Sequence, residues 1–427
     1  MSVGPGSILH LDIEKPAAGG RMLARHHGLV LLVEGAIPGE RVAARVQSAK
    51  KGMAYAETVD LLEASADRRE PSGDARCGGQ SYAHISYPRQ LRLKGEVIRD
   101  AFARIGRMPL PGAPAVTGSP ETGYRMRARL HVSGGRVGFF REGTREICDA
   151  GATGQFLPAT QTWIEGVERT IRDARLSGLT DVEMAENVPG DERACHLELQ
   201  AGCDMRAFAA LAVGLAGLSA GRADRPGGTV LAGTPVVSDV LHARHGDPAS
   251  AFRLRRHARA FFQGNRFLLE PLVRHVLSHV PAGPVVDVYA GVGLFGLALA
   301  AAGQQTVTLV ESDPIGGADL LANAAPFGDR VRVERTSVEA FVASPARLRE
   351  TTVVVDPPRT GLSRQAVAGL LAAQPPRIVY VSCDVATLAR DSRTLVDGGC
   401  ELASLAGVDL FPGSAHIETI GVFTREG

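Results

Sequence analysis

The sequence predicts an α/β protein whose C-terminal part contains a parallel sheet, preceded by a small all-β domain and a central α+β domain. Two observations predict the sheet: short Val- and Ile-rich runs such as VVDVYAG, TTVVVDPPR and RIVYVSCD, and helical patterns between them. Nearly continuous apolar runs are what strands buried on both faces require. A third observation predicts the β-domain, because residues 6–62 alternate short apolar runs with Gly and Pro.

Three domains are expected in chain order. Residues 1–63 read as a small β-barrel. Residues 64–260 form the central domain, in which the spacing of apolar residues predicts a helix over 86–106 and a helical stretch around 206–219. The runs YRMRARLHVS and RVGFFRE read as strands of the same domain. Residues from 261 to 427 form the α/β domain.

The composition fits a folded protein of several domains. The chain has 427 residues, with 47 Lys and Arg against 46 Asp and Glu, and 44% of the residues are hydrophobic. These values exclude a collagen, a coiled-coil rod and an acidic disordered chain. The formal charge of +1 argues mildly against nucleic-acid binding, although a net charge says nothing about local patches.

The compartment is inferred from what the sequence does not contain. The N-terminus has no charged start followed by an apolar core, and no apolar run approaches the ~20 residues of a membrane span. Six Cys in a chain of this length are not a disulfide framework. We therefore expect a protein of the reducing cytoplasm with no membrane segment, and a monomer is the default expectation.

A glycine-rich turn follows the first strand of the predicted sheet. Asp287 lies four residues before Gly291, and Gly293 and Gly296 follow just ahead of the helical run LALAAAG. Such a turn lets the backbone approach a ligand at the helix N-terminus, and Glu311 lies where a ribose diol is commonly held. Because an acid and the turn occur together, adenosine without pyrophosphate, as in S-adenosylmethionine, fits better than NAD.

Two later strands end in residues that carry chemistry. Asp356 follows VVV and is itself followed by two prolines, which stiffen the turn. Cys383 follows RIVYVS, and a predicted helix begins behind it, where a helix N-terminus lowers a thiol pKa. Ligands bind at this edge of an open α/β sheet. Small buried apolar residues are the better interpretation of four other cysteines: Cys77, Cys195, Cys203 and Cys400.

Five motifs occur in the order found in one known family. They are Phe261-Phe-Gln263-Gly-Asn265, Asp287-Val-Tyr-Ala-Gly-Val-Gly293, Asp356-Pro-Pro-Arg359-Thr-Gly361, Val381-Ser-Cys383-Asp384, and Asp409-Leu-Phe-Pro412 with His416-Ile-Glu418. In these motifs the sequence resembles the bacterial RNA 5-methyluridine methyltransferases, which use S-adenosylmethionine. The segment GAIPGERV is similar to the TRAM domain, a small OB-like β-barrel that binds RNA. The resemblance covers nearly the whole chain and implies a class I, Rossmann-like methyltransferase domain.

The resemblance implies covalent catalysis on a uridine of structured RNA, either rRNA or tRNA. Cys383 would add to C6 of uracil, since C5 alone is a poor nucleophile, and Glu418 would remove the C5 proton afterwards. Taken by itself, Glu418 reads as a solvated charge, and only the motif His416-x-Glu418 raises it above that. The cofactor contacts implied by the resemblance are Gln263, Tyr289, Glu311 and Asp356. Arg359 is a weaker candidate for orienting the strand end or the RNA.

The sequence departs from the family at a metal site. Many members hold an iron–sulfur cluster with four Cys. In this chain the first of these positions falls at Pro71 or Ser72, the second is Cys77, the third is Gln80, and the fourth falls near Thr153. One thiolate cannot hold a cluster that needs four, and the nearby Cys148 does not restore the count. We therefore predict no iron–sulfur cluster and no other metal.

RNA contacts and competing functions stay open at this point. Residues 241–260 contain five Arg and three His against one Asp, which fits an RNA contact and a solvated face equally well. Phosphate contacts of the barrel are expected from its basic residues Arg21, Arg25, Arg41, Lys50 and Lys51. The alternatives are a catalytically silent RNA-binding protein on the same fold and a nicotinamide-dependent oxidoreductase, which the DPPR and SCD motifs disfavour. No residue identifies the RNA.

Overall fold

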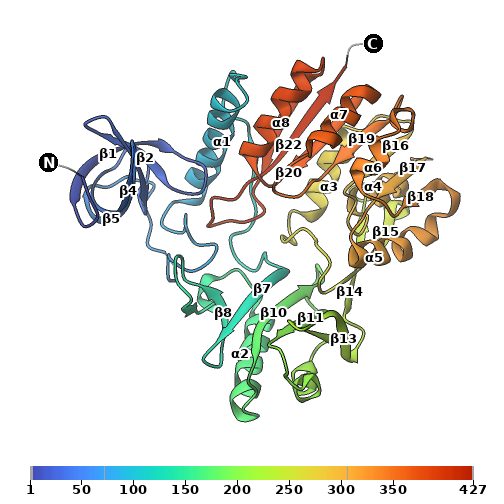
Figure 1. Cartoon of the computed structure of the whole chain (residues 1–427), viewed down its shortest axis with the longest axis horizontal. Helices are drawn as coiled ribbons and strands as arrows, with labels where there is room; N and C mark the ends of the chain where they lie inside the picture. The colour runs from blue at the N-terminus through green and yellow to red at the C-terminus, as the bar shows by residue number, and fades with distance from the viewer. Residues whose placement is uncertain (1–2, 72, 305, 426–427) are drawn as a thin grey trace.

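The computed structural model describes residues 3–71, 73–304 and 306–425. Figure 1 shows three lobes: a barrel at the N-terminus, a central sheet, and a C-terminal sheet flanked by helices. The predicted α/β fold class, with an N-terminal barrel and an additional central domain, is confirmed.

The N-terminal lobe is a closed barrel of five strands joined in the order β1-β2-β3-β5-β4. Alternate apolar side chains, such as Leu11 and Ile13, are buried inside it. The strands are β1 (Ile8–Pro16), β2 (Met22–His26), β3 (Leu29–Glu34), β4 (Arg41–Lys50) and β5 (Met53–Glu63).

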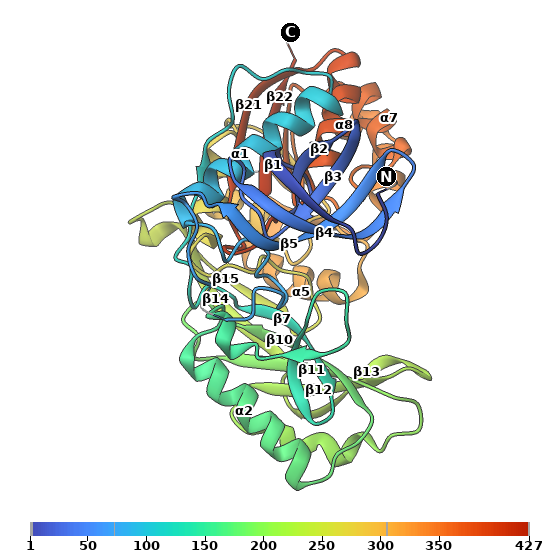
Figure 2. The same ribbon diagram turned by 90° about the vertical axis from the view of Figure 1, so that its left-hand side faces the viewer.

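Helix α1 (Tyr87–Arg104) confirms the helical spacing over 86–106 and lies between the barrel and the C-terminal sheet (Figure 1). In Figure 2 the barrel, α1 and strands β21 and β22 overlap along the line of sight. Leu93 on this helix packs into the core of the barrel. Phe102 packs instead into the apolar cluster that contains Leu388 of helix α8 (Val385–Asp397). The helix therefore connects the two lobes.

The central lobe is a seven-stranded sheet in the order β13-β12-β11-β10-β7-β8-β9, with helix α2 (Pro158–Asp173) packed against it. Its strands are β7 (Arg127–Ser133), β8 (Arg136–Phe140), β9 (Ile147–Cys148), β10 (Leu179–Glu186), β11 (Arg193–Leu199), β12 (Gly217–Arg222) and β13 (Arg225–Gly233). The two strands predicted from YRMRARLHVS and RVGFFRE correspond to β7 and β8.

The helical stretch predicted around 206–219 is wrong in its second half. A short 3₁₀ helix covers Met205–Ala212, and strand β12 begins at Gly217. The helix ends at Ala212 because Val213 is extended, and Gly214 then adopts a left-handed conformation with φ = 75°. The following residues then pair in parallel with β11, a long-range contact that local periodicity does not reveal.

The C-terminal lobe is an eight-stranded sheet in the order β18-β17-β16-β19-β20-β22-β21-β6. The first five of these strands are parallel, as predicted, whereas β22 runs antiparallel to β20. The strands are β6 (Val116–Thr117), β16 (Val285–Val288), β17 (Val307–Val310), β18 (Val331–Glu334), β19 (Thr352–Val355), β20 (Arg377–Ser382), β21 (Glu401–Val408) and β22 (Glu418–Thr424).

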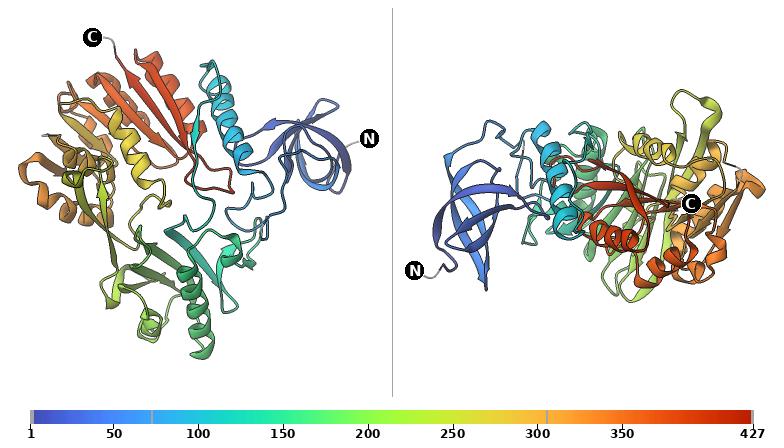
Figure 3. Two further views of the ribbon diagram at one scale, coloured as in Figure 1. Left: turned by 180° about the vertical axis from the view of Figure 1, so that it is seen from behind. Right: turned by 90° about the horizontal axis from the view of Figure 1, so that it is seen from above.

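Helices cover both faces of this sheet (Figure 3). One apolar cluster contains residues of α3 (Leu269–Ser278), α4 (Leu294–Ala301) and α5 (Pro314–Ala324). The cluster on the other face contains residues of α1, α6 (Val338–Val342), α7 (Arg364–Ala373) and α8. Successive strand residues alternate between the two clusters, which explains why the strands are apolar throughout. Strand β6 and helix α1, both from the segment before residue 261, complete this layer.

The Arg-rich stretch 241–260 belongs largely to a hairpin of β14 (Val236–His242) and β15 (Ala251–His257). Arg256 is fully buried, where it pairs with Asp239 and donates to the carbonyl of Glu186. Arg255 pairs with Asp319 of α5 at 3.5 Å. These two arginines therefore hold the hairpin in place rather than forming a free basic surface. In the described part of the chain, no helix combines the length and apolarity needed to cross a membrane.

Candidate active site

Four neighbouring parallel strands end in register at one edge of the C-terminal sheet. The residues that directly follow β16, β17, β19 and β20 are Tyr289, Glu311, Asp356 and Cys383. The structure thus brings together four of the six predicted site residues at the edge where ligands bind in open α/β sheets.

The glycine-rich turn after β16 is organised by two carboxylates. Buried Asp287 accepts a hydrogen bond from the Gly296 amide at 2.8 Å, at the start of α4. A Cβ on Gly296 would lie 2.1 Å from Leu309, so the helix can approach the sheet only with glycine there. Glu311 accepts from the Gly291 amide at 2.7 Å, which joins the end of β17 to the turn.

Two further residues of this edge have unusual conformations or environments. Tyr289 has φ = 61°, a strained conformation for a residue with a side chain, and such strain is concentrated at functional sites. The Gln263 amide donates to the Asp356 carboxylate at 3.2 Å. Burial raises the pKa of Asp356 to about 7, and the hydrogen bond from Gln263 opposes that shift.

Cys383 lies between the end of β20 and the start of α8. Asp384 caps the helix by accepting from the Thr387 amide at 2.8 Å. The thiol is half-buried, and burial raises its pKa to about 11, with the Glu418 carboxylate adding to the shift and Arg359 opposing it. The expected lowering of this pKa by the helix N-terminus is therefore not seen, because desolvation and nearby carboxylates outweigh it.

Glu418 is brought to Cys383 by the antiparallel pairing of β22 with β20. Thr419 pairs with Ser382, so Glu418, the first residue of β22, lies next to Cys383, which directly follows β20. Glu418 is only 4% exposed, and its Oε1 atom has no hydrogen-bond partner. Burial, together with the charge of Asp356, raises the pKa of Glu418 well above its ordinary value. The interpretation of Glu418 as a solvated charge is thus wrong.

The loop that leads into β22 is held by residues that sequence reasoning missed. Lys94 of α1 forms an ion pair with Asp409 at 2.5 Å, and both side chains are almost completely buried. The Asn265 amide donates to the carbonyl of Leu410 at 3.1 Å. A lysine among apolar residues at helical spacing was the available signal, since a charge on a buried helix face requires a partner.

A cavity of about 410 Å³ opens in front of Cys383. Its walls come from segments that are far apart in the chain: the β1–β2 connection, the loop of residues 74–81, helix α1, the β8–β9 connection, the start of α8 and the loop before β22. The residues that line it include Gly19, Gly79, Cys383, Asp384 and His416. A pocket assembled from such distant segments was not foreseeable from local patterns.

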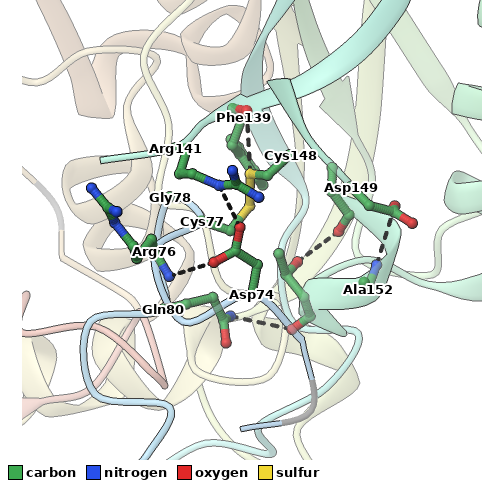
Figure 4. Close-up of a disulfide and its surroundings, with 12 residues drawn as sticks. Asp74, Arg76, Cys77, Gly78, Gln80, Phe139, Arg141, Cys148, Asp149 and Ala152 are labelled. Carbon is green, nitrogen blue, oxygen red and sulfur yellow. Dashed lines mark hydrogen bonds and ion pairs between the residues drawn. A yellow bond between two sulfur atoms is a disulfide. The ribbon is translucent and has the colours of Figure 1, made fainter. Parts of the chain in front are cut away.

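Cys77 and Cys148 form a disulfide (Figure 4). The interpretation of Cys77 as a lone buried cysteine is therefore wrong, because a pairing across 71 residues leaves no local sequence signal. Gln80 donates to the carbonyl of Thr153 at 3.2 Å, so two of the positions that correspond to cluster ligands in the family contact each other directly. Ser72 lies outside the described residues. The donors present do not fit a four-thiolate cluster. Within the described ranges, no group of three or more His, Cys, Asp or Glu is arranged to hold a metal ion.

The carboxylate beside Cys383 makes a testable contribution to its reactivity. We expect Glu418→Gln to move the pH profile of Cys383 alkylation by iodoacetamide to lower pH, because the variant removes a negative charge that disfavours the thiolate. The rate at Cys383 is followed by peptide mass spectrometry from pH 7 to 11. Glu401→Gln, an exposed change at the far end of the sheet, serves as the matched control and leaves the profile unchanged. A profile that stays in place in Glu418→Gln contradicts the electrostatic coupling.

Comparisons with known proteins agree with this geometry. Residues 247–426 match the family described as tRNA (Uracil-5-)-methyltransferase, and residues 3–59 match the TRAM domain. The chain is 32% identical to an uncharacterized RNA methyltransferase of Corynebacterium glutamicum, over 100% of this chain and 98% of the relative. It is 31% identical to an uncharacterized RNA methyltransferase of Streptomyces coelicolor, over 98% of this chain and 93% of the relative.

A solved structure shares the fold. The tRNA (uracil-54, C5)-methyltransferase of Pyrococcus abyssi, in complex with S-adenosyl-L-homocysteine, aligns with a TM-score of 0.78 and 22% identity, over 97% of this chain and 99% of that one. The strand-edge motifs, the N-terminal barrel and the full-length relatives lead to one assignment. The chain belongs to the RNA uracil-C5 methyltransferase family with an N-terminal TRAM domain, whose members are S-adenosylmethionine-dependent enzymes.

Proposed function

We propose that this enzyme methylates C5 of a uridine in structured RNA, ribosomal or transfer, through covalent addition of Cys383 to C6. The observation that carries the proposal is the pairing of β22 with β20. This pairing places a buried carboxyl group, Glu418, beside a half-buried thiol at the ligand-binding edge of the sheet. In this proposal residues 1–63 bind RNA, residues 64–260 recognise the substrate, and residues 261–427 perform the chemistry.

The residues at the strand edge fit S-adenosylmethionine. Buried Asp287 has an oxygen, Oδ1, without a partner, and burial raises its pKa to about 8. Glu311 lies at the end of β17, where a carboxylate accepts hydrogen bonds from ribose hydroxyls. Gln263 and Asp356 would border the same ligand from the other side, and Tyr289 from the turn. When bound, the cofactor supplies a methyl group on a positively charged sulfur.

The side chains divide the work on the base. The Cys383 thiolate adds to C6, forming a C–S bond, and the electron pair displaced toward C5 makes that carbon nucleophilic. Once C5 is methylated, Glu418 accepts the C5 proton, and the C–S bond breaks to release the thiolate. A carboxylate whose pKa is raised by burial is a stronger base when it is ionised, which suits Glu418 for this step.

The cavity gives the base access to the thiol. A uracil paired or stacked in RNA must be extruded before C6 can reach Cys383. The cavity in front of Cys383, about 410 Å³, would accept the extruded nucleotide. In the barrel, Lys50 and Lys51 are exposed and suited to phosphates, whereas Arg21 pairs with Glu34 at 3.3 Å and is less available.

The experiment that tests the proposal is mass-spectrometric mapping of 5-methyluridine. Ribosomal and transfer RNA are prepared separately from cells with the protein, without it, and with Cys383→Ala in its place. We expect 5-methyluridine to be lost at one or more sites in one RNA class, both without the protein and with the variant. The class that loses the modification identifies the substrate. Unchanged 5-methyluridine in both classes contradicts the proposed function.

A further inference from the structure

The wall of the cavity that faces Cys383 is a loop with few regular hydrogen bonds of its own. Cys77, Gly78, Gly79 and Ser81 contribute to the cavity lining, as do Ala18 and Gly19 of the β1–β2 connection. This Cys77 loop, defined as residues 74–81, contains neither helix nor strand. Its position must therefore be set by contacts to its neighbours.

The Cys77 loop is fixed to the central domain by a disulfide (Figure 4) and by several non-covalent contacts. Gln80 donates to the Thr153 carbonyl at 3.2 Å, and Gln155 donates to the Gly78 carbonyl at 3.0 Å. The disulfide joins Cys77 to Cys148 of β9. An isolated bridge pairs Cys77 with Arg141, and the Arg141 guanidinium donates to Asp74 at 2.6 Å. The ion pair is exposed and therefore weak, since such pairs contribute ~0–1 kcal/mol. The disulfide is the one covalent tie among these contacts.

The opposite side of the Cys77 loop contacts the segment that leads to Glu418. The Tyr82 amide, just after the loop, donates to the carbonyl of Gly413 at 2.7 Å. A Cβ on Gly413 would lie 3.3 Å from the carbonyl oxygen of Gly79, so these two backbones are in close contact. A shift of the Cys77 loop would therefore change the cavity and disturb the backbone that precedes the candidate base.

The barrel also rests on this loop. A Cβ on Gly20 would lie 3.0 Å from Ala415 and 3.4 Å from the Ser81 hydroxyl. The Arg21 guanidinium lies 3.7 Å from the Glu142 carboxylate, near the start of the β8–β9 connection. The Cys77 loop and the β8–β9 connection therefore add to the contacts that α1 makes with the RNA-binding barrel.

We propose that the Cys77–Cys148 disulfide positions the RNA-binding wall of the active site, so that RNA binding, but not cofactor binding, depends on its oxidation state. This inference rests on the proposed function. The residues predicted to contact the cofactor are Gln263, Tyr289, Glu311 and Asp356. None of them lines the cavity that the Cys77 loop borders. Cys77 and Cys148 are accordingly positioning residues, and neither takes part in the reaction.

The redox step is a thiol–disulfide exchange. A dithiol reductant attacks the disulfide, breaks the S–S bond, and becomes a cyclic disulfide, while Cys77 and Cys148 take up two electrons and two protons as thiols. Reoxidation by a small-molecule disulfide reverses the exchange. Cys383 is a free thiol in both states and is unchanged by the reductant.

The test compares oxidised enzyme, enzyme reduced with dithiothreitol, and the double variant Cys77→Ala/Cys148→Ala with and without dithiothreitol. We measure KM for RNA, kcat, and the Kd of S-adenosylhomocysteine by calorimetry. Reduction should raise KM for RNA by roughly tenfold, below the ~100-fold that a 1 Å misplacement can cost, with the Kd of S-adenosylhomocysteine unchanged. The double variant should have the high KM with and without reductant. Cys203→Ala, which removes another free thiol, should respond as the wild type does.

Each other outcome is informative. Equal KM values in all forms overturn the inference, and so does an effect of dithiothreitol that persists in the double variant. An unaltered Kd for S-adenosylhomocysteine shows that the double variant is folded. If the double variant is not folded, the comparison of oxidised with reduced wild-type enzyme still tests the inference. If the oxidised wild-type enzyme methylates no RNA, the proposed function fails. The positioning role of the disulfide is then tested by the alkylation rate of Cys383. A rate that changes on reduction supports this role, and an equal rate overturns it.

Discussion

Replacing Cys383 with Ala should abolish methyl transfer to RNA. Removing a covalent nucleophile costs on the order of 10⁶-fold in kcat where it has been measured, because the remaining groups cannot replace the bond it forms. Here the loss should be as complete, since uracil C5 is a poor nucleophile until the thiol adds to C6. The measurement is incorporation of labelled methyl groups into undermodified RNA.

Binding should survive the same change. The predicted cofactor contacts are Gln263 and the residues that follow β16, β17 and β19, and Cys383 is not among them, so S-adenosylhomocysteine should bind to the variant as to the wild type. Cys203→Ala, a change of the same size at a partly exposed free thiol of the central domain, is the matched control and should remain active. Methylation by Cys383→Ala at the wild-type rate would overturn the covalent mechanism, and loss of cofactor binding would show that the variant had misfolded.

Lys94→Met should destabilise the protein by about 3–5 kcal/mol, the cost of removing one partner of a buried ion pair. Both side chains are nearly inaccessible, and Lys94 also donates to the carbonyl of Phe411 at 3.2 Å. The variant leaves the Asp409 carboxylate buried without its counter-charge. The free energy of unfolding is measured by urea denaturation, and the fluorescence intensity of the single Trp is one probe of the folded fraction.

The sign of the pH dependence provides a second check on Lys94→Met. Burial already raises the pKa of Asp409, and Lys94 lowers it, so loss of Lys94 raises that pKa further. The folded variant then binds more protons than the unfolded chain, and its stability falls as the pH rises through this range. The deficit relative to wild type should therefore grow from pH 5 to pH 8. The double change Lys94→Met/Asp409→Leu should recover much of the loss, and a single variant within 1 kcal/mol of wild type at pH 8 would contradict the argument.

The parts of the fold that follow from local pattern could be predicted from the sequence. The runs ending at Val288, Val355 and Ser382 are apolar throughout because both faces of their strands are covered. Since parallel strands end at a common edge, the sequence also indicated that Glu311, Asp356 and Cys383 would be neighbours. The helix over 86–106 was recognisable from its spacing alone.

The rest depends on pairings between distant segments. Glu418 reaches Cys383 only because β22 inserts antiparallel beside β20, which no local periodicity indicates. The disulfide across 71 residues and the ion pair across 315 residues are likewise invisible in a window of sequence. The direction of the Cys383 pKa shift was missed for the same reason, since both its causes, burial of the thiol and the Glu418 carboxylate, depend on how distant segments pack.

Helix α1 and strand β6 precede residue 261 in the chain but complete the C-terminal lobe, which limits how the gene can recombine and how the protein can be engineered. Excision at residue 261 would remove Phe102 from Leu388 and expose an apolar face of α8. It would also uncover the end of β21, which pairs with β6 through Gly407 and Val408, and unpaired strand edges promote aggregation. Transplanting the C-terminal segment alone onto another RNA-binding module should therefore fail unless residues 87–117 are carried with it. Recombination within the gene is constrained in the same way, because a crossover between these segments would separate parts that fold as one.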